Sequence, residues 1–247
     1  MGKLDNKVAI VTGASRGIGE SCSIHLAKEG AKVIVASRNY SECEKVVEKI
    51  KQLGSDAIPF SVNITDFEKT KSMADFVVGK YGKVDILVNN AGITDDAFFE
   101  NMSCGQWLNV INTNLNGTFF CTKAVVGYMI GQKYGRIINI ASIAGQRGAR
   151  TQANYAASKA GIIGMTLTLS QELGGKGITV NAVSPGLIAT DMIKNIPEKI
   201  KEHNLKKIPL GRFGKVDEIA SVVLMLASDD GGYCNGMVCE VNGGMCI

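Results

Sequence analysis

Apolar residues along the chain gather in short β-branched runs that alternate with longer helix-forming stretches. Seven runs have the length and composition of strands, at residues 7–13, 31–37, 56–63, 84–92, 135–142, 177–186 and 237–244. Helix-forming stretches lie between them, at residues 17–29, 41–53, 66–80, 105–131 and 154–174, with a helical pair within 191–228. Because the strand runs are apolar almost throughout, we expect both faces of the sheet to be covered.

The alternation of strands and helices predicts a parallel sheet with right-handed crossovers. The predicted fold class is therefore α/β, a Rossmann-type doubly wound parallel sheet of about seven strands with helices on both faces. Neither a repeat nor a linker interrupts the 247 residues, so we expect residues 1–247 to form one domain.

Composition excludes several classes of protein. Apolar residues make up 45% of the chain and charged residues 20%, as is usual for a globular enzyme. No apolar run approaches the roughly 18 residues that span a membrane, and the first residues, MGKLDNK, lack the apolar core of a secretory signal. We therefore expect a cytoplasmic protein without membrane contact. A net charge of +4 without a basic or base-stacking module argues against nucleic acid.

The seven cysteines form an odd set without a C-x-x-C pair, and the two histidines, His25 and His203, lie far apart. Neither a zinc site nor a disulfide framework fits this spacing. We expect reduced thiols and no bound metal.

A glycine-rich segment, VTGASRGIGE at 11–20, follows the first strand run and opens the first helical stretch. Gly13, Gly17 and Gly19 permit a tight turn and close approach of a ligand, and the helix N-terminus offers free N–H groups to a pyrophosphate. A plain strand-to-helix turn would also use glycines. However, strand, loop and helix fall where a dinucleotide site requires them.

The end of the second strand run distinguishes the two nicotinamide cofactors. NAD-binding proteins place a carboxylate there for the ribose hydroxyls, whereas this chain has Ser37, Arg38 and Asn39, with no acid before Glu42. Arg38, with Arg16 in the glycine loop, would bind an adenosine 2′-phosphate. Each could be an ordinary surface arginine, but together they favour NADP(H).

The segment NYAASKAG at 154–161 places Tyr155 and Lys159 one turn apart on one helix face. A phenol with its ordinary pKa near 10 needs help to act at neutral pH. A partly buried ammonium could lower that pKa. An exposed pair without a function is the alternative.

Four motifs occur in order: TGASRGIG, NNAG at 89–92, YAASK, and SPGLIATDM at 184–192. In these motifs the chain resembles the short-chain dehydrogenase/reductase family over essentially its whole length. The resemblance implies that Tyr155 donates a proton to a substrate carbonyl, and that Ser142 hydrogen-bonds the carbonyl oxygen. It implies that Lys159 binds the nicotinamide ribose and lowers the phenol pKa, and that Asn114 holds a water linking Lys159 to a proton relay.

The resemblance also implies a set of cofactor contacts, although the family more often has aspartate where this chain has Asn63. The implied cofactor-binding residues are Gly13, Ser15, Arg16, Gly17, Ile18, Gly19, Ser37, Arg38, Asn63, Ile64, Asn90, Ala91, Gly92, Tyr155, Lys159, Pro185, Gly186, Ile188 and Thr190.

Within the family, QANYAASKAG, ATDM, PLGRFG and VNGGM most resemble 3-oxoacyl-acyl-carrier-protein reductases. The implied activity is NADPH-dependent reduction of a 3-oxoacyl thioester in fatty acid synthesis. Asp95 departs from the arginine usual there, and 145–152 carries Arg147 and Arg150 in place of a glycine/asparagine-rich loop. Acetoacetyl-CoA or another small ketone is the alternative substrate. A non-catalytic NADP-binding protein is the other alternative, against which the intact Ser142, Tyr155, Lys159 and Asn114 argue.

The resemblance further implies a mobile substrate lid near 191–215 and a homotetramer in which the helices near 105–131 and 154–174 pair between subunits. Seven basic and two acidic residues between 194 and 215 give this segment a charge of +5. Lys133 and Lys176 match positions where carrier-protein reductases keep a basic residue. We expect the lid edge and these two lysines to form one docking surface for an acidic acyl carrier protein.

Overall fold

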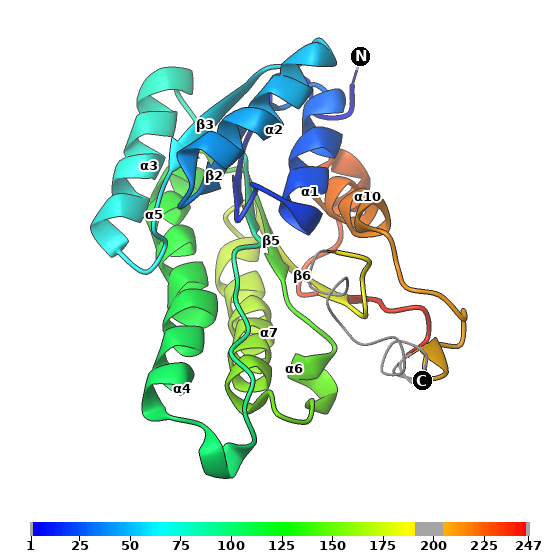
Figure 1. The fold of residues 1–247 in the computed structure, drawn as a ribbon. Coiled ribbons are helices and arrows are strands. Elements are labelled where there is room, and N and C mark those ends of the chain that lie inside the picture. Colours follow the sequence, from blue (N-terminus) through cyan, green and yellow to red (C-terminus); the bar gives the residue numbers. More distant parts are fainter. Residues whose placement is uncertain (1, 191–204, 246–247) are drawn as a thin grey trace.

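The structure, a computed structural model, describes residues 2–190 and 205–245 (Figure 1). Seven strands form one parallel sheet in the order β3-β2-β1-β4-β5-β6-β7. The strands are β1 (Val8–Thr12), β2 (Lys32–Ser37), β3 (Ala57–Ser61), β4 (Ile86–Asn89), β5 (Gly135–Ile140), β6 (Ile178–Pro185) and β7 (Val238–Val241). The prediction of a doubly wound parallel α/β sheet is confirmed.

Helices cover both faces of this sheet (Figure 1). One face carries α1 (Gly17–Lys28), α2 (Tyr40–Gln52) and α10 (Val216–Ala227), and the other carries α3 (Phe67–Tyr81), α5 (Gly117–Gln132) and α7 (Ala153–Gly174). Short helices are η1 (Phe99–Asn101), α4 (Cys104–Ile111), α6 (Ala144–Arg147) and η3 (Asp229–Gly231). Side chains of β1 alternate between the two faces, with Ala9 and Val11 packed in the core under α1 and Val8 and Ile10 in the core under α3.

The helix predicted at 105–131 is interrupted. Between α4 and α5 the backbone forms a π-helical segment, η2 (Asn112–Asn116), which carries the fully buried Asn114. Such insertions occur often at functional sites, and periodicity of the sequence does not reveal them.

A buried polar network joins the neighbouring strands β4 and β5. Asn89 on β4 and Asn139 on β5 are register partners, and Asn89 Nδ2 donates to Asn139 Oδ1 at 2.9 Å. Asn89 Nδ2 also donates to Thr122 Oγ1 on α5, and Asn139 Nδ2 donates to Thr166 Oγ1 on α7. The network therefore ties both central strands to the two helices above them.

Several sequence predictions fall on residues outside the described part of the chain. Of the helical pair within 191–228, the described residues contain α10. Most of the expected lid lies outside them, including Lys194, Lys199 and Lys201. Within residues 2–190 and 205–245, no helix is long and apolar enough to cross a membrane.

Candidate active site

The carboxyl ends of the parallel strands meet at one edge of the sheet, where the chain reverses its winding direction between β1 and β4. In doubly wound folds this edge carries the ligand site. The loops after β1, β4, β5 and β6 all open there. They carry the glycine loop, the NNAG motif, Ser142 and the segment that begins at Pro185.

The glycine loop has the backbone that the sequence predicts. Gly13 and Gly17 have φ values of +62° and +60°, which favour glycine. A Cβ on Gly13 would lie 2.7 Å from Ala91 Cα, whereas one on Gly17 would meet only Thr190 Cγ2, at 3.7 Å. No side chain caps α1, so its first N–H groups remain available to an anion.

Asn90 shapes this loop. Its Nδ2 donates to the carbonyl oxygens of Thr12 and Gly13, both at 3.0 Å. In return, Thr12 Oγ1 accepts from the backbone N–H groups of Asn90 and Ala91. The side chain of Asn90 thus joins the end of β4 to the glycine loop.

At the expected adenosine end, Arg16 and Arg38 are both exposed. Neither guanidinium has a hydrogen-bond or ion-pair partner among the described residues. Ser37 Oγ instead holds its own loop, since it donates to Asn39 O and accepts from Asn39 N, each at 3.2 Å. Two unpaired arginines therefore remain available for a phosphate.

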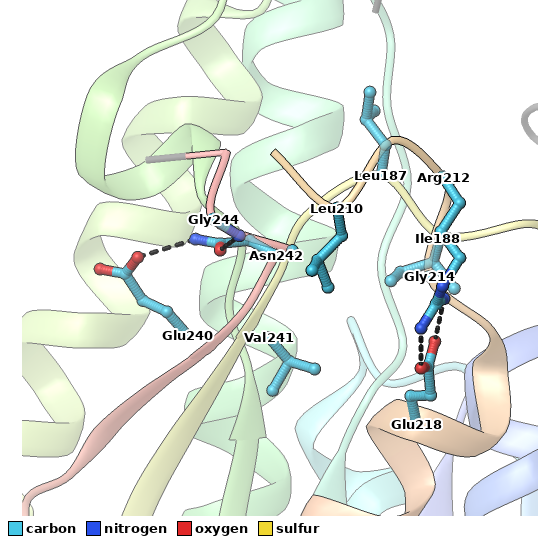
Figure 2. A pocket seen from close by; sticks show the side chains of 11 residues that line it. Leu187, Ile188, Leu210, Arg212, Gly214, Glu218, Glu240, Val241, Asn242 and Gly244 are labelled. Atoms are coloured by element: carbon cyan, nitrogen blue, oxygen red, sulfur yellow. Dashed lines mark hydrogen bonds and ion pairs between the residues drawn. The ribbon is translucent and has the colours of Figure 1, made fainter. Parts of the chain in front are cut away.

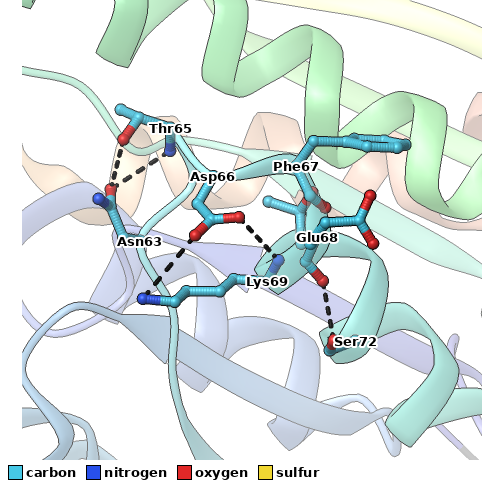
Figure 3. A network of polar contacts seen from close by, with 8 residues as sticks. Asn63, Thr65, Asp66, Phe67, Glu68, Lys69 and Ser72 are labelled. Atoms are coloured by element: carbon cyan, nitrogen blue, oxygen red, sulfur yellow. Dashed lines mark hydrogen bonds and ion pairs between the residues drawn. The ribbon is translucent and has the colours of Figure 1, made fainter.

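Asn63 and Ile64 follow the end of β3, and Figure 3 shows the contacts of Asn63. Asn63 Oδ1 accepts from the N and Oγ1 atoms of Thr65, at 3.2 and 3.0 Å, and so forms a turn that leads to Asp66, the N-cap of α3. The Ile64 side chain is buried against Gly117, where a Cβ would approach it to 2.5 Å. Both residues therefore have clear structural tasks.

Tyr155, Lys159 and Ser142 come together as predicted. Lys159 is buried, and its Nζ donates to the Ile140 carbonyl at 2.7 Å. Nζ lies 5.6 Å from the centre of the Tyr155 ring. The Ser142 hydroxyl lies near enough to the Tyr155 phenol to lower its pKa. A proton donor, a neutral hydrogen-bond donor and a buried amine thus share one site.

Burial has the largest effect on the pKa of the Tyr155 phenol. Burial raises the pKa of Tyr155; the Ser142 hydroxyl lowers it, and the Asp96 carboxylate raises it. Burial also lowers the pKa of Lys159 to about 8. The Lys159 ammonium is bonded to Ile140 O and is itself disfavoured by burial, and its expected effect on the phenol pKa stays a prediction.

The Asn114 side chain forms hydrogen bonds with the backbone of Ile93, directly after the NNAG motif. Its Oδ1 accepts from Ile93 N at 2.8 Å, and its Nδ2 donates to Ile93 O at 3.0 Å and to Ser158 Oγ at 3.1 Å. Both amide hydrogens are therefore used. The water that the resemblance assigns to Asn114 could bind only to its oxygen atoms.

Sequence reasoning missed the supporting role of Asn154. This buried residue accepts from Tyr155 N at 2.7 Å and donates to the carbonyl oxygens of Asp95 and Gln106. Asp95, which departs from the related reductases, accepts from Gln106 Nε2 at 2.8 Å. Residues 93–97 are thus attached both to α4 and to the start of α7. The sequence signals these contacts only by placing polar residues beside the known motifs.

The segment after β6 lies beside the glycine loop. Pro185 O accepts from Ile143 N at 3.1 Å, and a Cβ on Gly186 would lie 2.7 Å from Asn242 Cα. Ile188 is 7% exposed, and Thr190 faces Gly17. The last two residues of the 184–192 motif lie outside the described residues.

A pocket of about 280 Å³ adjoins this segment (Figure 2). Leu187, Ile188 and Val241 line it, and the Arg212–Glu218 ion pair closes one side. Two hydrogen bonds, of 2.6 and 2.9 Å, join this pair, and the arginine lowers the pKa of Glu218 to about 2. The pocket thus combines apolar side chains with the Arg212–Glu218 ion pair and with Glu240, which accepts a hydrogen bond from Asn242.

The basic residues expected to meet a carrier protein form two separate groups. Lys133 and Lys176 are exposed where the chain enters β5 and β6. Arg212 and Lys215 lie beside the pocket, near the carboxyl end of β6. The two groups lie at opposite ends of the strands, and because most of the lid lies outside the described residues, a shared docking surface stays a prediction.

Comparison with known proteins gives consistent matches. The family model for short chain dehydrogenases matches residues 7–201. The 3-oxoacyl-(acyl-carrier-protein) reductase FabG of Thermotoga maritima is 46% identical over 245 residues, 99% of this chain and 100% of that protein. FabG of Pseudomonas aeruginosa is 44% identical over 98% of both chains. The crystal structure of gox2181 superposes with a TM-score of 0.95 at 38% identity, and covers 98% of this chain and 97% of that one.

Proposed function

The chain belongs to the short-chain dehydrogenase family, and on that premise we propose that it is a cytoplasmic 3-oxoacyl-acyl-carrier-protein reductase of fatty acid synthesis. One observation carries the substrate class. A FabG reductase matches this chain at 46% identity over its full length. We further propose that residues 1–247 form a single NADP-binding domain.

The residues at the β1–β4 edge fit NADPH. Uncapped N–H groups at the start of α1 would bind the pyrophosphate, and the unpaired Arg16 and Arg38 would bind the 2′-phosphate. Thr190 and Gly17, which border open space, would lie along the cofactor. When bound, NADPH supplies the hydride that the carbonyl carbon receives.

Residues of this chain then supply the proton that the carbonyl oxygen needs. Tyr155 gives its phenolic proton to the carbonyl oxygen as that oxygen gains negative charge, and Ser142 donates a hydrogen bond to the same oxygen. Because the pKa of Tyr155 is raised, the phenol keeps its proton at neutral pH until the carbonyl takes it. With a pKa of about 8, Lys159 can bind ribose oxygens as a cation and pass a proton back afterwards.

Docking of the carrier protein involves a second subunit in this proposal. Tyr155 lies in the first turn of α7 and Lys176 lies beyond its end; 22 residues make this helix about 33 Å long. Lys133 and Lys176 therefore cannot dock a carrier beside the phenol of their own chain. Exposed apolar residues on α4, α5 and α7, namely Trp107, Leu108, Phe119 and Leu167, support pairing of these helices in a homotetramer.

Steady-state NADPH oxidation with acetoacetyl-carrier protein, acetoacetyl-CoA and a small uncharged ketone tests the proposal. We expect the highest kcat/KM with the carrier-bound substrate. A preference for the CoA thioester or the small ketone would replace it with the alternative substrate class. Binding of NADPH without turnover of any ketone would indicate a non-catalytic protein.

Charge reversal tests the docking lysines. Lys133→Glu and Lys176→Glu should raise KM for the carrier-bound substrate and leave the small ketone unaffected, because only the carrier protein is acidic. Lys71→Glu, at an exposed position on α3, is the matched control. Equal effects on both substrates would show that the lysines act on the active site instead.

A further inference from the structure

We propose that Asp96, held by Gln152, is a positioning residue for the Tyr155 proton donor. The inference rests on the proposed function, and it assigns a role to a carboxylate that the motifs leave unassigned.

The contact between these residues is direct. Gln152 Nε2 donates to Asp96 Oδ2 at 2.9 Å. Gln152 is also the N-cap residue of α7, but its side chain does not cap the helix. The side chain best placed to satisfy the N-terminus of the catalytic helix is used instead to hold a carboxylate of the neighbouring loop.

The loop that carries Asp96 is held at alternate residues. Ile93 is held by Asn114 through both of its backbone polar groups. Asp95 O accepts from Asn154 Nδ2, and Ala97 N donates to Thr151 O at 2.9 Å. Both neighbours of Asp96 are thus held, and its exposed carboxylate meets Gln152 at the start of α7.

The backbone directly before Gln152 is strained. Thr151, directly before Gln152, has a φ of +69°, a conformation that a β-branched residue rarely adopts. Its carbonyl receives the hydrogen bond from Ala97 in this conformation. Strain of this kind persists where surrounding contacts over-determine it, and it concentrates at functional sites. The turn therefore fixes Gln152 against Asp96.

Asp96 acts on the phenol through its charge. It raises the pKa of Tyr155, after the larger effect of burial. Within residues 2–190 and 205–245, the other charged groups near the phenol are Lys159 on α7, Asp95 on the same loop, and Arg147 and Arg150 between β5 and α7. Lys159 is bonded to Ile140 O, Asp95 to Gln106, and Arg150 stacks on the Phe98 ring at 4.9 Å. Asp96 is the carboxylate that favours the protonated phenol.

The test is the pH dependence of kcat/KM for reduction of a small ketone by the full-length enzyme. Asp96→Asn keeps an acceptor for Gln152 and removes only the charge. Reduction needs the protonated phenol, so activity falls as pH rises through its pKa. Without the carboxylate this fall should move to lower pH, because a nearby negative charge favours the protonated phenol. The reverse oxidation should gain activity at correspondingly lower pH.

Two further variants separate positioning from general charge effects. Asp95→Asn removes the same charge one residue away and should leave the pH midpoint in place. Gln152→Met leaves the Asp96 carboxylate charged but removes the hydrogen bond that holds it. The pH midpoint of this variant should move to lower pH, as in Asp96→Asn, but by less. An unchanged or higher midpoint for Asp96→Asn would overturn the inference, and so would an equal shift in Asp95→Asn.

Failure of the proposed function would look different. A wild-type protein that reduces no ketone would reject the reductase assignment. Ultraviolet titration of the Tyr155 phenol, with Tyr155→Phe as the blank, would then decide the inference by itself. The phenol of Asp96→Asn should ionise at lower pH than that of the wild type, and equal titration curves would overturn the proposal.

Discussion

Lys159 lies one helical turn after Tyr155 on α7, and its ammonium is 5.6 Å from the centre of the phenol ring. The two groups are near neighbours, but the shortest polar contact of the amine is to a strand carbonyl. In the proposed mechanism Tyr155 is the proton donor, and Lys159 is a buried amine whose lowered pKa lets it lose its charge readily.

Replacement of Tyr155 by phenylalanine should lower kcat by about 100- to 10,000-fold, the usual contribution of a general acid. NADPH affinity, measured by fluorescence titration, should stay near that of the wild type, because only the phenol oxygen is removed. Near-normal turnover in this variant would rule out the mechanism. Phe60→Tyr, away from the site, can serve as a control for handling and assay.

Burial of Lys159 should make stability depend on pH. Its pKa is about 8 in the folded chain against 10.5 ordinarily, so between these values the unfolded chain binds more protons and stability rises with pH. In Lys159→Met no amine titrates at this position, so this contribution to the pH dependence of stability is absent. From pH 7 to pH 10, urea unfolding should show the wild type gaining about 2.5 kcal/mol relative to the variant. A constant difference would show that the amine titrates normally.

Replacement of Arg38 by aspartate should shift preference from NADPH toward NADH. The change removes a phosphate-binding cation and adds an acceptor for the ribose hydroxyls. One charge-assisted contact corresponds to about 1.5–3 kcal/mol, so the ratio of kcat/KM values should change roughly 10- to 100-fold. Arg38→Ala should show the loss for NADPH without the gain for NADH. A wild-type enzyme that already prefers NADH would contradict the assignment.

Thr151→Gly should stabilise the fold by about 0.5–1 kcal/mol. Glycine relieves the left-handed strain at φ +69°, which outweighs the added freedom of the unfolded chain. Thr94→Gly, at a residue without positive φ in the nearby loop, should instead destabilise it. Thermal unfolding of both variants measures the difference. A less stable Thr151→Gly would mean that contacts of the threonine side chain exceed its strain.

The sequence was a good guide to the sheet, because buried parallel strands and their crossover helices each leave a local apolar pattern. All seven strands lie within their predicted runs. The π-helical segment around Asn114 was not predictable in this way, because one inserted residue hardly changes the apolar pattern of the helix that contains it. The four-residue α6 is likewise too short for a periodic signal.

The sequence motifs predicted that Ser142, Tyr155 and Lys159 share one site. The pKa values of these groups, however, depend on residues that lie elsewhere in the sequence. The role of Ile140 O at Lys159 and of Asp96 near Tyr155 could not be read from the helical spacing. Asn154 was visible only as the residue before the tyrosine. Two of its three contacts reach residues about fifty positions away in the sequence, which local patterns do not encode.

The paired amides of Asn89 and Asn139 have a consequence for how the chain avoids misassembly. The strands around them are runs of isoleucine and valine, so a two-residue slip of β5 along β4 would return apolar side chains to the same faces. That slip would separate the two amides and leave each buried without its partner, at a cost of about 1–3 kcal/mol per group. The buried amides of Asn89 and Asn139 thus favour the native register of β4 and β5 over shifted registers that hydrophobic packing alone would allow.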